Sequence, residues 1–316
     1  MAEKLDIICI GTALVDSIIK GFDPNPVSAS GFRAESGTLN VGGEAVNSSI
    51  AAAKMGMRSA VFGSIGRDAA GDMIISALNR YGVETDRLIR SDEHPTPVTT
   101  MFVNEDGTRK SITTGAHRYN FHPERYPDLF TDARALILGS LFRAPFDDPE
   151  IIHSVLSMAA EAGQTIFADT KIPNFRFLKL SDLRDSLLLI NYITPNEDEA
   201  KYYTGKTEPE EMADVFLEMG VKNVIIKLGS KGCFFKNSTE KIILPAHNIT
   251  AVDATGAGDN LIAGFASEII RGAGHMDALR FANGCGAICT TAVGASTALK
   301  NREQVLQFIE NESGAI

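Results

Sequence analysis

The chain has 316 residues, of which 44% are hydrophobic, and this is enough to form the core of one large domain. Its formal net charge is −10 and its pI about 5.2, which argues against nucleic acid or an anionic membrane as a partner. No run of 18 apolar residues is present that could span a membrane, and the charged residues 1–6 do not resemble a signal peptide. We therefore expect a cytoplasmic protein.

Cysteine usage agrees with this compartment. Cys9 and Cys233 lie in strand-like segments, and Cys285 and Cys289 are spaced i,i+4 on an apolar helix, which is not a usual zinc spacing. We expect four buried, reduced thiols.

The order of expected elements is mainly an alternation of strands and helices. Apolar strands are expected at 6–11, 60–66, 135–139, 165–169, 187–194 and 223–229, with helices at 48–55, 69–80, 150–162, 208–219, 258–271, 276–293 and 302–310. Two hairpins interrupt this order, one at 99–113 around Asp106-Gly107 and one at 233–244. This order predicts a parallel α/β sheet in a single domain, with the first hairpin outside the main sheet.

A Gly-rich loop, 252–260, leads directly into the helix expected at 258–271. Free N–H groups at a helix start favour an anion, whereas the carboxylate of Asp259 would repel a phosphate there. Asp259 is better explained as a base for a nucleophile that attacks the phosphate. The alternative is a capped helix behind a flexible turn, and the loop alone leaves the two interpretations about even.

Other polar residues follow strand ends or begin helices. Asp16 lies just beyond the first strand, where α/β sheets bind ligands, although it could equally be a turn residue. Gly42-Gly43 precedes a helix of small residues in which Asn47 could direct its amide at hydroxyl groups. Asn196 and Glu199 have the spacing of a capping box, which is the simpler interpretation of that pair.

Neither a P-loop nor a standard dinucleotide-binding motif is present, since GxxxxGK[ST] does not occur and GxGxxG is not completed at Gly256 or Gly284. Four motifs in order do resemble the ribokinase-like sugar kinases of the PfkB family. These motifs are Gly42-Gly43 with Asn47, Gly63-x-x-Gly66-x-Asp68, Asn196-x-x-Glu199 and the loop 252–259. The resemblance covers nearly the whole chain, and its last motif is the most specific.

The resemblance implies a Rossmann-like αβα sandwich with a small β-sheet lid inserted at about 15–41 and 95–117. It also implies that Asp259 is the catalytic base and that Gly256, Ala257 and Gly258 form an anion hole. Further roles are implied for residues outside this loop. The sugar would be bound by Asp16, Gly42, Gly43 and Asn47, and Mg²⁺ would be organised through water by Asn196 and Glu199. ATP would be held by Asn196, Lys227, Gly229, Ser230, Gly232 and Asn283. A monovalent cation such as K⁺ would lie beside Asp253 and Ser296.

Two departures from the family pattern bear on the substrate. Glu44 stands where several subfamilies have Lys or a small residue, and it disfavours a phosphorylated sugar. Arg176 follows a longer spacing than the Asp-x-Asn-x-Arg element of fructokinase relatives; it, or Arg118 beside His117, would have to reach the site to bind a sugar acid.

The resulting hypothesis is ATP-dependent phosphorylation of a hydroxymethyl group on a free sugar or sugar acid, with Lys171 or Lys227 assisting the transferring phosphoryl group. A nucleoside kinase is the first alternative, and a non-catalytic sugar sensor on the same scaffold is the second. The resemblance also implies a homodimer, because exposed lid edges in this family often pair.

Overall fold

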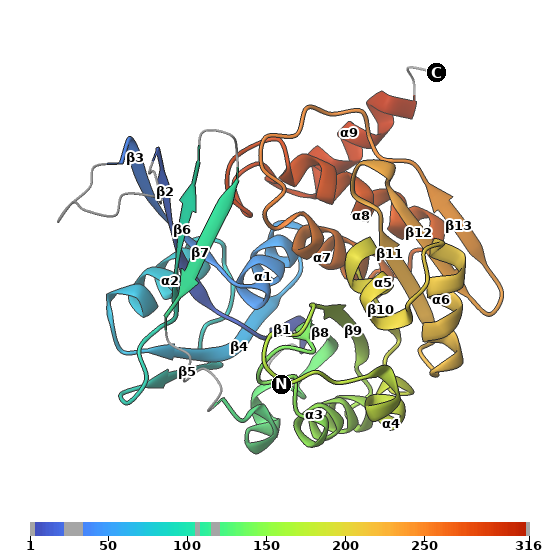
Figure 1. Ribbon diagram of the computed structural model, residues 1–316, viewed down its shortest axis with the longest axis horizontal. Coiled ribbons are helices and arrows are strands. Elements are labelled where there is room, and N and C mark those ends of the chain that lie inside the picture. Colours follow the sequence, from blue (N-terminus) through green and yellow to red (C-terminus); the bar gives the residue numbers. More distant parts are fainter. Residues whose placement is uncertain (1–3, 22–33, 105–107, 115–120, 314–316) are drawn as a thin grey trace.

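Alternating apolar strands build one large sheet between two helical layers, as the computed structural model shows for residues 4–21, 34–104, 108–114 and 121–313 (Figure 1). Its spatial order is β13 (Lys241–Leu244), β12 (Cys233–Asn237), β11 (Asn223–Lys227), β10 (Tyr192–Ile193), β9 (Thr165–Thr170), β8 (Ala133–Leu141), β1 (Leu5–Ile10), β4 (Ser59–Gly66) and β5 (Leu88–Ser91). Strands β11 to β5 are parallel, and the β12–β13 hairpin is antiparallel at one edge.

The helices cover both faces of this sheet. One layer contains α1 (Glu44–Lys54), α2 (Ala69–Arg80), α7 (Ala257–Ile270), α8 (His275–Cys289) and α9 (Arg302–Ser313). The other contains α3 (Pro149–Glu161), α4 (Arg184–Leu187), α5 (Glu197–Thr204) and α6 (Pro209–Glu218). Short 3₁₀ turns lie at η2 (Pro123–Arg125), η3 (Pro127–Leu129), η4 (Leu180–Leu183) and η5 (Gly229–Lys231).

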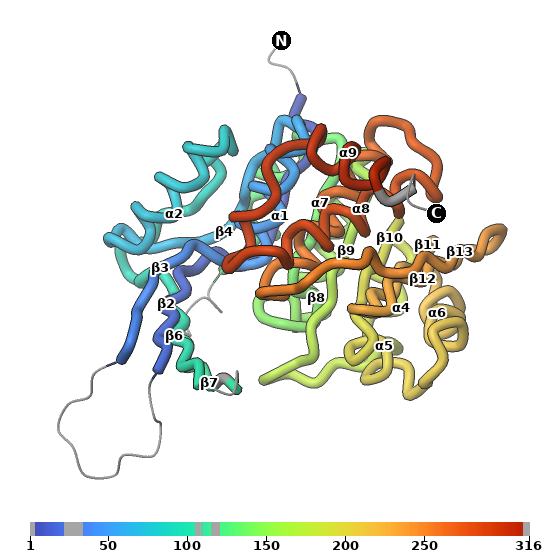
Figure 2. The backbone as a smooth tube through the Cα atoms, turned by 90° about the horizontal axis from the view of Figure 1, so that it is seen from above, coloured from blue at the N-terminus to red at the C-terminus, as the bar shows by residue number. Residues whose placement is uncertain are grey.

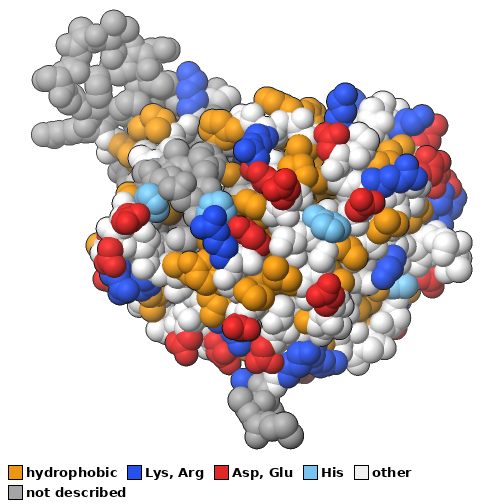
Figure 3. Space-filling model, turned by 90° about the horizontal axis from the view of Figure 1, so that it is seen from below, with side chains coloured by type: hydrophobic (Ala, Val, Ile, Leu, Met, Phe, Trp, Pro, Cys, Tyr) orange, Lys and Arg blue, Asp and Glu red, His pale blue; other side chains and the backbone are white. Residues whose placement is uncertain are grey.

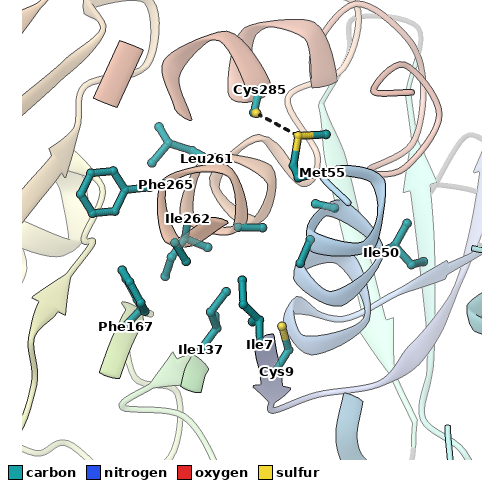
Figure 4. Packing of buried hydrophobic residues seen from close by; sticks show 14 of the residues in the cluster. Ile7, Cys9, Ile50, Met55, Ile137, Phe167, Leu261, Ile262, Phe265 and Cys285 are labelled. Carbon is teal, nitrogen blue, oxygen red and sulfur yellow. Dashed lines mark hydrogen bonds between the residues drawn. The ribbon is translucent and has the colours of Figure 1, made fainter. Parts of the chain in front are cut away.

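Buried apolar side chains fix the two central helices of the first layer. Figure 4 shows Ile262 and Phe265 of α7 on the side of the helix that faces the sheet residues Ile137 and Phe167. Met55, the residue that follows α1, lies beside Cys285 of α8. Burial of each such side chain stabilises the fold by roughly 1.5–3 kcal/mol. The packing therefore holds the N-termini of α1 and α7 at the carboxyl edge of the sheet.

A second, four-stranded sheet projects from one end of the main sheet (Figures 1 and 2). Its order is β3 (Ser36–Gly42), β2 (Leu14–Lys20), β6 (Val98–Val103) and β7 (Arg109–Thr113). The expected β6–β7 hairpin is confirmed, with Thr99 opposite Thr113. On its inner face, Ile18 and Met101 line a cavity against the loop that contains Asp253. The αβα sandwich with a small second sheet is therefore confirmed.

Two expected elements differ from the structure. The strand expected at 187–194 is wrong except for Tyr192–Ile193. The apolar residues 187–190 form the end of α4 and the turn after it, where Leu187 and Ile190 are buried. The helix expected at 276–293 ends at Cys289, where the Thr290 and Thr291 hydroxyls donate to helix carbonyls. Strand β3 lies largely within the segment that the resemblance assigned to the lid, where the residue pattern alone predicted no individual strand.

The structure also bears on the partners considered from the sequence. Among the described residues, none of the helices has the length and apolar character needed to cross a membrane. The face seen in Figure 3 carries acidic and basic side chains next to one another.

Candidate active site

The carboxylate of Asp259 lies where the N-termini of α7 and α1 meet. Its Oδ2 accepts a hydrogen bond of 2.8 Å from the side-chain amide of Asn47. Both residues are buried, at 7% exposure each, so the carboxylate is directed at the amide of a helix far away in sequence and not at the apolar core. The two candidates that the sequence assigned to base and sugar are therefore adjacent.

Burial raises the pKa of Asp259 to about 7. The ammonium of Lys171 and the hydrogen bond from Asn47 act in the opposite direction, while the charges of Glu44 and Asp169 raise this pKa further. A carboxyl group with a pKa near neutral pH can accept a proton and release it again, which is the property that a general base needs.

Two further acids lie beside this pair. Burial, and next the charge of Glu44, raises the pKa of Asp16 to about 6. The backbone is close to these groups, because a Cβ on Gly42 would lie 2.3 Å from Asp16 Oδ2. At Gly43, φ is +95° and a Cβ would meet the Thr12 carbonyl oxygen at 2.2 Å, so only glycine fits this helix start. Asp16, Gly42, Gly43 and Asn47 thus form one group.

The expected anion hole is the start of α7. Gly256 is its N-cap, with φ +78°, and a Cβ there would lie 2.2 Å from the Cβ of Ala295. The Asn260 amide donates to the carbonyl oxygens of both Gly256 and Ala295, which fixes the loop. The Nζ of Lys227 lies 3.0 Å from the position of a Cβ on Gly258, so a cation lies close to the first turn of this helix.

A pocket of about 570 Å³ extends from this loop toward β13 and α8. Its lining includes every residue expected to hold the nucleotide except Asn196: Lys227, Gly229, Ser230, Gly232 and Asn283. The Asn283 amide donates to the Pro245 carbonyl at 2.8 Å and is fixed at the pocket wall. The remaining lining is largely apolar, with Ile249, Leu261 and Ala287, which suits a flat base ring.

Asn196 and Glu199 form a reciprocal capping box at the start of α5, in which each side chain accepts a hydrogen bond of 2.9 Å from the other residue's backbone N–H. Glu199 Oε2 also accepts from the Thr170 hydroxyl at 2.9 Å, whereas Oε1 has no hydrogen bond to a described residue. Burial, and next the charge of Asp169, raises the pKa of Glu199. A buried carboxylate with an open oxygen fits a hydrated Mg²⁺, which keeps most of its water. No group of three or more potential direct ligands occurs among the described residues.

Two lysines flank Asp169 at the end of β9. Lys227 forms an ion pair with Asp169 Oδ1, which also accepts from the Thr194 hydroxyl at 2.8 Å. Burial opposes ionisation of Asp169, but the ammonium groups of Lys227 and Lys171 lower its pKa below the ordinary value. Burial likewise disfavours the charge on Lys171, but the surrounding carboxylates raise its pKa overall.

The candidate cation residues are in adjacent loops. Asp253 Oδ1 accepts from the N–H and hydroxyl of Thr255, and Oδ2 accepts from the Gly294 N–H at 3.0 Å. Asp253 thus ties the anion-hole loop to the loop that contains Ser296. The Ser296 carbonyl accepts from the Lys54 ammonium, so in this structure it faces a protein cation.

The structure does not bring Arg176 into this group. Its guanidinium is paired with Asp148, the N-cap of α3, and its side chain is 59% exposed. His117 and Arg118 lie outside the described residues.

Sequence reasoning missed several residues that position the site. Asn260 follows Asp259 directly, and Lys54 lies two turns after Asn47, but neither stands in a motif with an evident role. Lys171 or Lys227 was expected to assist the phosphoryl group, but the position of Asp169 between them was missed, although a charged residue at a strand end was a usable signal.

A three-layer fold with a buried carboxylate in the first turn of a helix, beside a pocket of about 570 Å³, is typical of small-molecule kinases. Residues 4–302 match the pfkB family carbohydrate kinases, and the chain belongs to this family.

Similar proteins agree with this assignment. A ribokinase from Arabidopsis thaliana is 29% identical over 98% of this chain and 82% of its own length. A 2-dehydro-3-deoxygluconokinase from Bacillus subtilis is 29% identical, covering 81% of this chain and 82% of its own. The solved structure of Arabidopsis thaliana ribokinase complexed with ribose and ATP superposes with a TM-score of 0.85 at 25% identity, over 98% of this chain and 99% of that one.

Proposed function

We propose that the protein transfers the γ-phosphoryl group of ATP to a hydroxymethyl group of a free sugar or sugar acid. The observation that carries this proposal is the position of Asp259, a buried carboxyl group with a pKa near 7 that is hydrogen-bonded to Asn47 at the start of α7. A base at this position can reach a hydroxyl group held by Asn47 and a phosphate held by the loop.

In the proposed reaction, Asp259 removes the proton of the hydroxyl group as its oxygen bonds to the γ-phosphorus. The bond from that phosphorus to the bridging oxygen breaks, and ADP leaves with the electron pair. The N–H groups of Gly256, Ala257 and Gly258 stabilise the charge on the phosphoryl oxygens. Asn196 and Glu199 would hold Mg²⁺ through water, and the ion would neutralise phosphate charge.

The sugar end of the site favours a ligand rich in hydroxyl groups. The Asn47 Oδ1 atom is buried without a hydrogen-bond partner among the described residues, so it is available to a donor. Asp16 and Glu44 add acceptors and negative charge. The small sheet above them would act as a lid that excludes water from the transfer.

Two lesser parts of the proposal concern a cation and the oligomeric state. Asp253 and the Ser296 loop would adjoin a K⁺ ion that shapes the anion hole. A homodimer through the lid is supported by its outer face, where Leu39 and Ile112 are 60% and 63% exposed on the two edge strands, β3 and β7.

The test is ATP consumption with a panel of neutral sugars, sugar acids and nucleosides, run beside Asp259→Asn. Turnover of a sugar or sugar acid that is lost in the variant supports the proposal. Turnover of nucleosides alone favours the nucleoside kinase. Sugar binding with no ATP consumption by the wild type favours the sensor and overturns the proposal.

A further inference from the structure

The backbone of Lys171 is held on both sides. Its N–H donates to the Leu141 carbonyl at 2.9 Å, and its own carbonyl accepts from the Tyr203 hydroxyl at 2.7 Å. The Tyr203 ring in turn stacks on buried Phe142, with centroids 4.0 Å apart. Phe142 has φ +76° and Ser140 has φ +63°, so this support contains two residues in the left-handed region. Such strain is concentrated where a fold fixes a functional group.

The ammonium group at the end of this side chain has no hydrogen-bond acceptor among the described residues. Four carboxylates act on its charge, those of Asp169, Glu44, Asp259 and Glu199. The nearest recorded approach is 3.9 Å, to Glu44 Oε1, which is too long for a hydrogen bond. Three N–H donors are therefore available to a ligand.

Lys227 provides the contrast. It also lies at the anion-binding loop, but it donates to Asp169, and this partner neutralises its charge. Of these two lysines, Lys171 is the one whose N–H donors find no acceptor in the described part of the chain. An ammonium that is three-quarters buried and lacks an acceptor is costly unless an anion completes its environment.

We propose that Lys171 is a further catalytic residue, which donates a hydrogen bond to an oxygen of the γ-phosphoryl group as that group passes from ATP to the sugar. This rests on the proposed function. The ammonium keeps its proton throughout. Asp259 takes the proton of the hydroxyl group, the new oxygen–phosphorus bond forms, and the bond to the bridging oxygen breaks. Asp259 and Glu44 carry negative charge that repels the phosphoryl group, and the positive charge of Lys171 offsets this repulsion.

A structural alternative is that Lys171 serves only to balance Glu44 and shape the sugar site. In that case Glu44→Gln and Lys171→Met would impair sugar binding similarly, and nucleotide affinity would stay unchanged. The γ-phosphoryl contact predicts a different pattern, because only a ligand that carries the third phosphate would sense the loss of the ammonium.

The experiment compares the affinity of wild type, Lys171→Met and Lys171→Arg for ADP and for the β,γ-imido analogue of ATP, by calorimetry with Mg²⁺ present. Lys171→Met should weaken the ATP analogue about tenfold and ADP less than twofold, because one charge-assisted hydrogen bond is lost. Its kcat should fall by about 10²–10³ with a smaller change in the KM for the sugar. Lys171→Arg should retain part of both. Lys201→Met removes an exposed lysine on α5 and serves as the matched control.

If Lys171→Met binds ADP and the ATP analogue with equally reduced affinity, or with unchanged affinity, and keeps a kcat near that of the wild type, the proposed role of Lys171 is overturned. The kinase proposal would stay intact. A wild type that binds neither nucleotide and phosphorylates nothing overturns the proposed function itself. If Lys171→Met does not fold, the selective loss must instead be seen in Lys171→Arg, and an unchanged ratio of the two affinities there contradicts the proposal.

Discussion

The carboxylate of Asp259 and the amide of Asn47 are joined by a 2.8 Å hydrogen bond across 212 positions of the chain. The bond links the first turns of α7 and α1, two helices that pack on the same face of the sheet. It orients the carboxylate toward the sugar side of the site, and it favours the ionised form.

Replacing Asn47 with alanine should therefore affect the pH dependence as well as the affinity. Without the amide, the pKa of Asp259 rises, so the acid limb of kcat/KM should move to higher pH, and the KM for the sugar should increase about tenfold. Ser49→Ala is the matched control, because Ser49 lies on the same helix and its hydroxyl donates only to the Val46 carbonyl. A limb that moves equally in both variants would contradict the role of Asn47.

The wild-type pH profile itself should show two ionisations on its acid side. The pKa of Asp259 is about 7 and that of Asp16 about 6, and the proposed roles require both groups to be ionised. The plot of log kcat/KM against pH should rise with unit slope between pH 6 and 7 and more steeply below, as expected when two acids must lose protons.

Asp16→Asn should leave a single ionisation in this profile, with a lower maximum caused by weaker sugar binding. The measurement needs initial rates at low sugar concentration from pH 5 to 9. A flat profile across pH 6–8 in the wild type would contradict the assignment of Asp259 as the base.

The same carboxylate should destabilise the folded protein above neutral pH. Its pKa is about 7 in the fold and 3.8 in its ordinary state, so the folded chain binds more protons than the unfolded chain between these values. Stability is therefore lost as pH rises through this window. Asp259→Asn removes the buried charge, and its free energy of unfolding should exceed that of the wild type at pH 8 by on the order of 2–4 kcal/mol.

Urea unfolding at pH 4, 6 and 8 measures this difference, which should grow with pH and level off above pH 7. Asp185→Asn, at an exposed acid on α4, provides the control and should show no such trend. If the difference in free energy of unfolding between Asp259→Asn and the wild type is independent of pH, the pKa of Asp259 is not raised by burial.

Much of this site could be anticipated because its residues stand in local patterns. The Gly-rich loop before α7 and the double glycine before α1 each predict a helix start with free N–H groups, and parallel strands place such starts at one edge. The paired lysines could not be anticipated in the same way. Whether Lys171 or Lys227 is neutralised depends on the direction of the Asp169 side chain, which is a tertiary property.

The errors in the fold have a similar origin. The apolar residues 187–190 are consistent with a buried strand or a helical turn, and periodicity cannot separate the two in so short a run. These residues form the helical turn because it packs against α3, with which α4 is in contact. At Asn196 and Glu199 the local pattern predicted the structure correctly, because the two residues form the expected capping box. The same two residues are also the ones proposed to organise Mg²⁺, so the structural and functional interpretations are compatible.

Gly256 offers the sharpest test of the anion hole. Alanine there must adopt φ +78° and must also fit a Cβ 2.2 Å from the Cβ of Ala295, so the loop has to move. Gly163→Ala is a matched control, because Gly163 has φ +74° with open space around its Cβ position. Both variants should lose about 1 kcal/mol from backbone strain. Gly256→Ala should lose more stability, and its kcat should fall by at least about 10² because the N–H groups no longer converge on the phosphoryl oxygens.

Chemical denaturation and steady-state rates measured on both variants give the comparison. Equal losses of stability together with wild-type turnover in Gly256→Ala would show that the loop does not hold the transferred group.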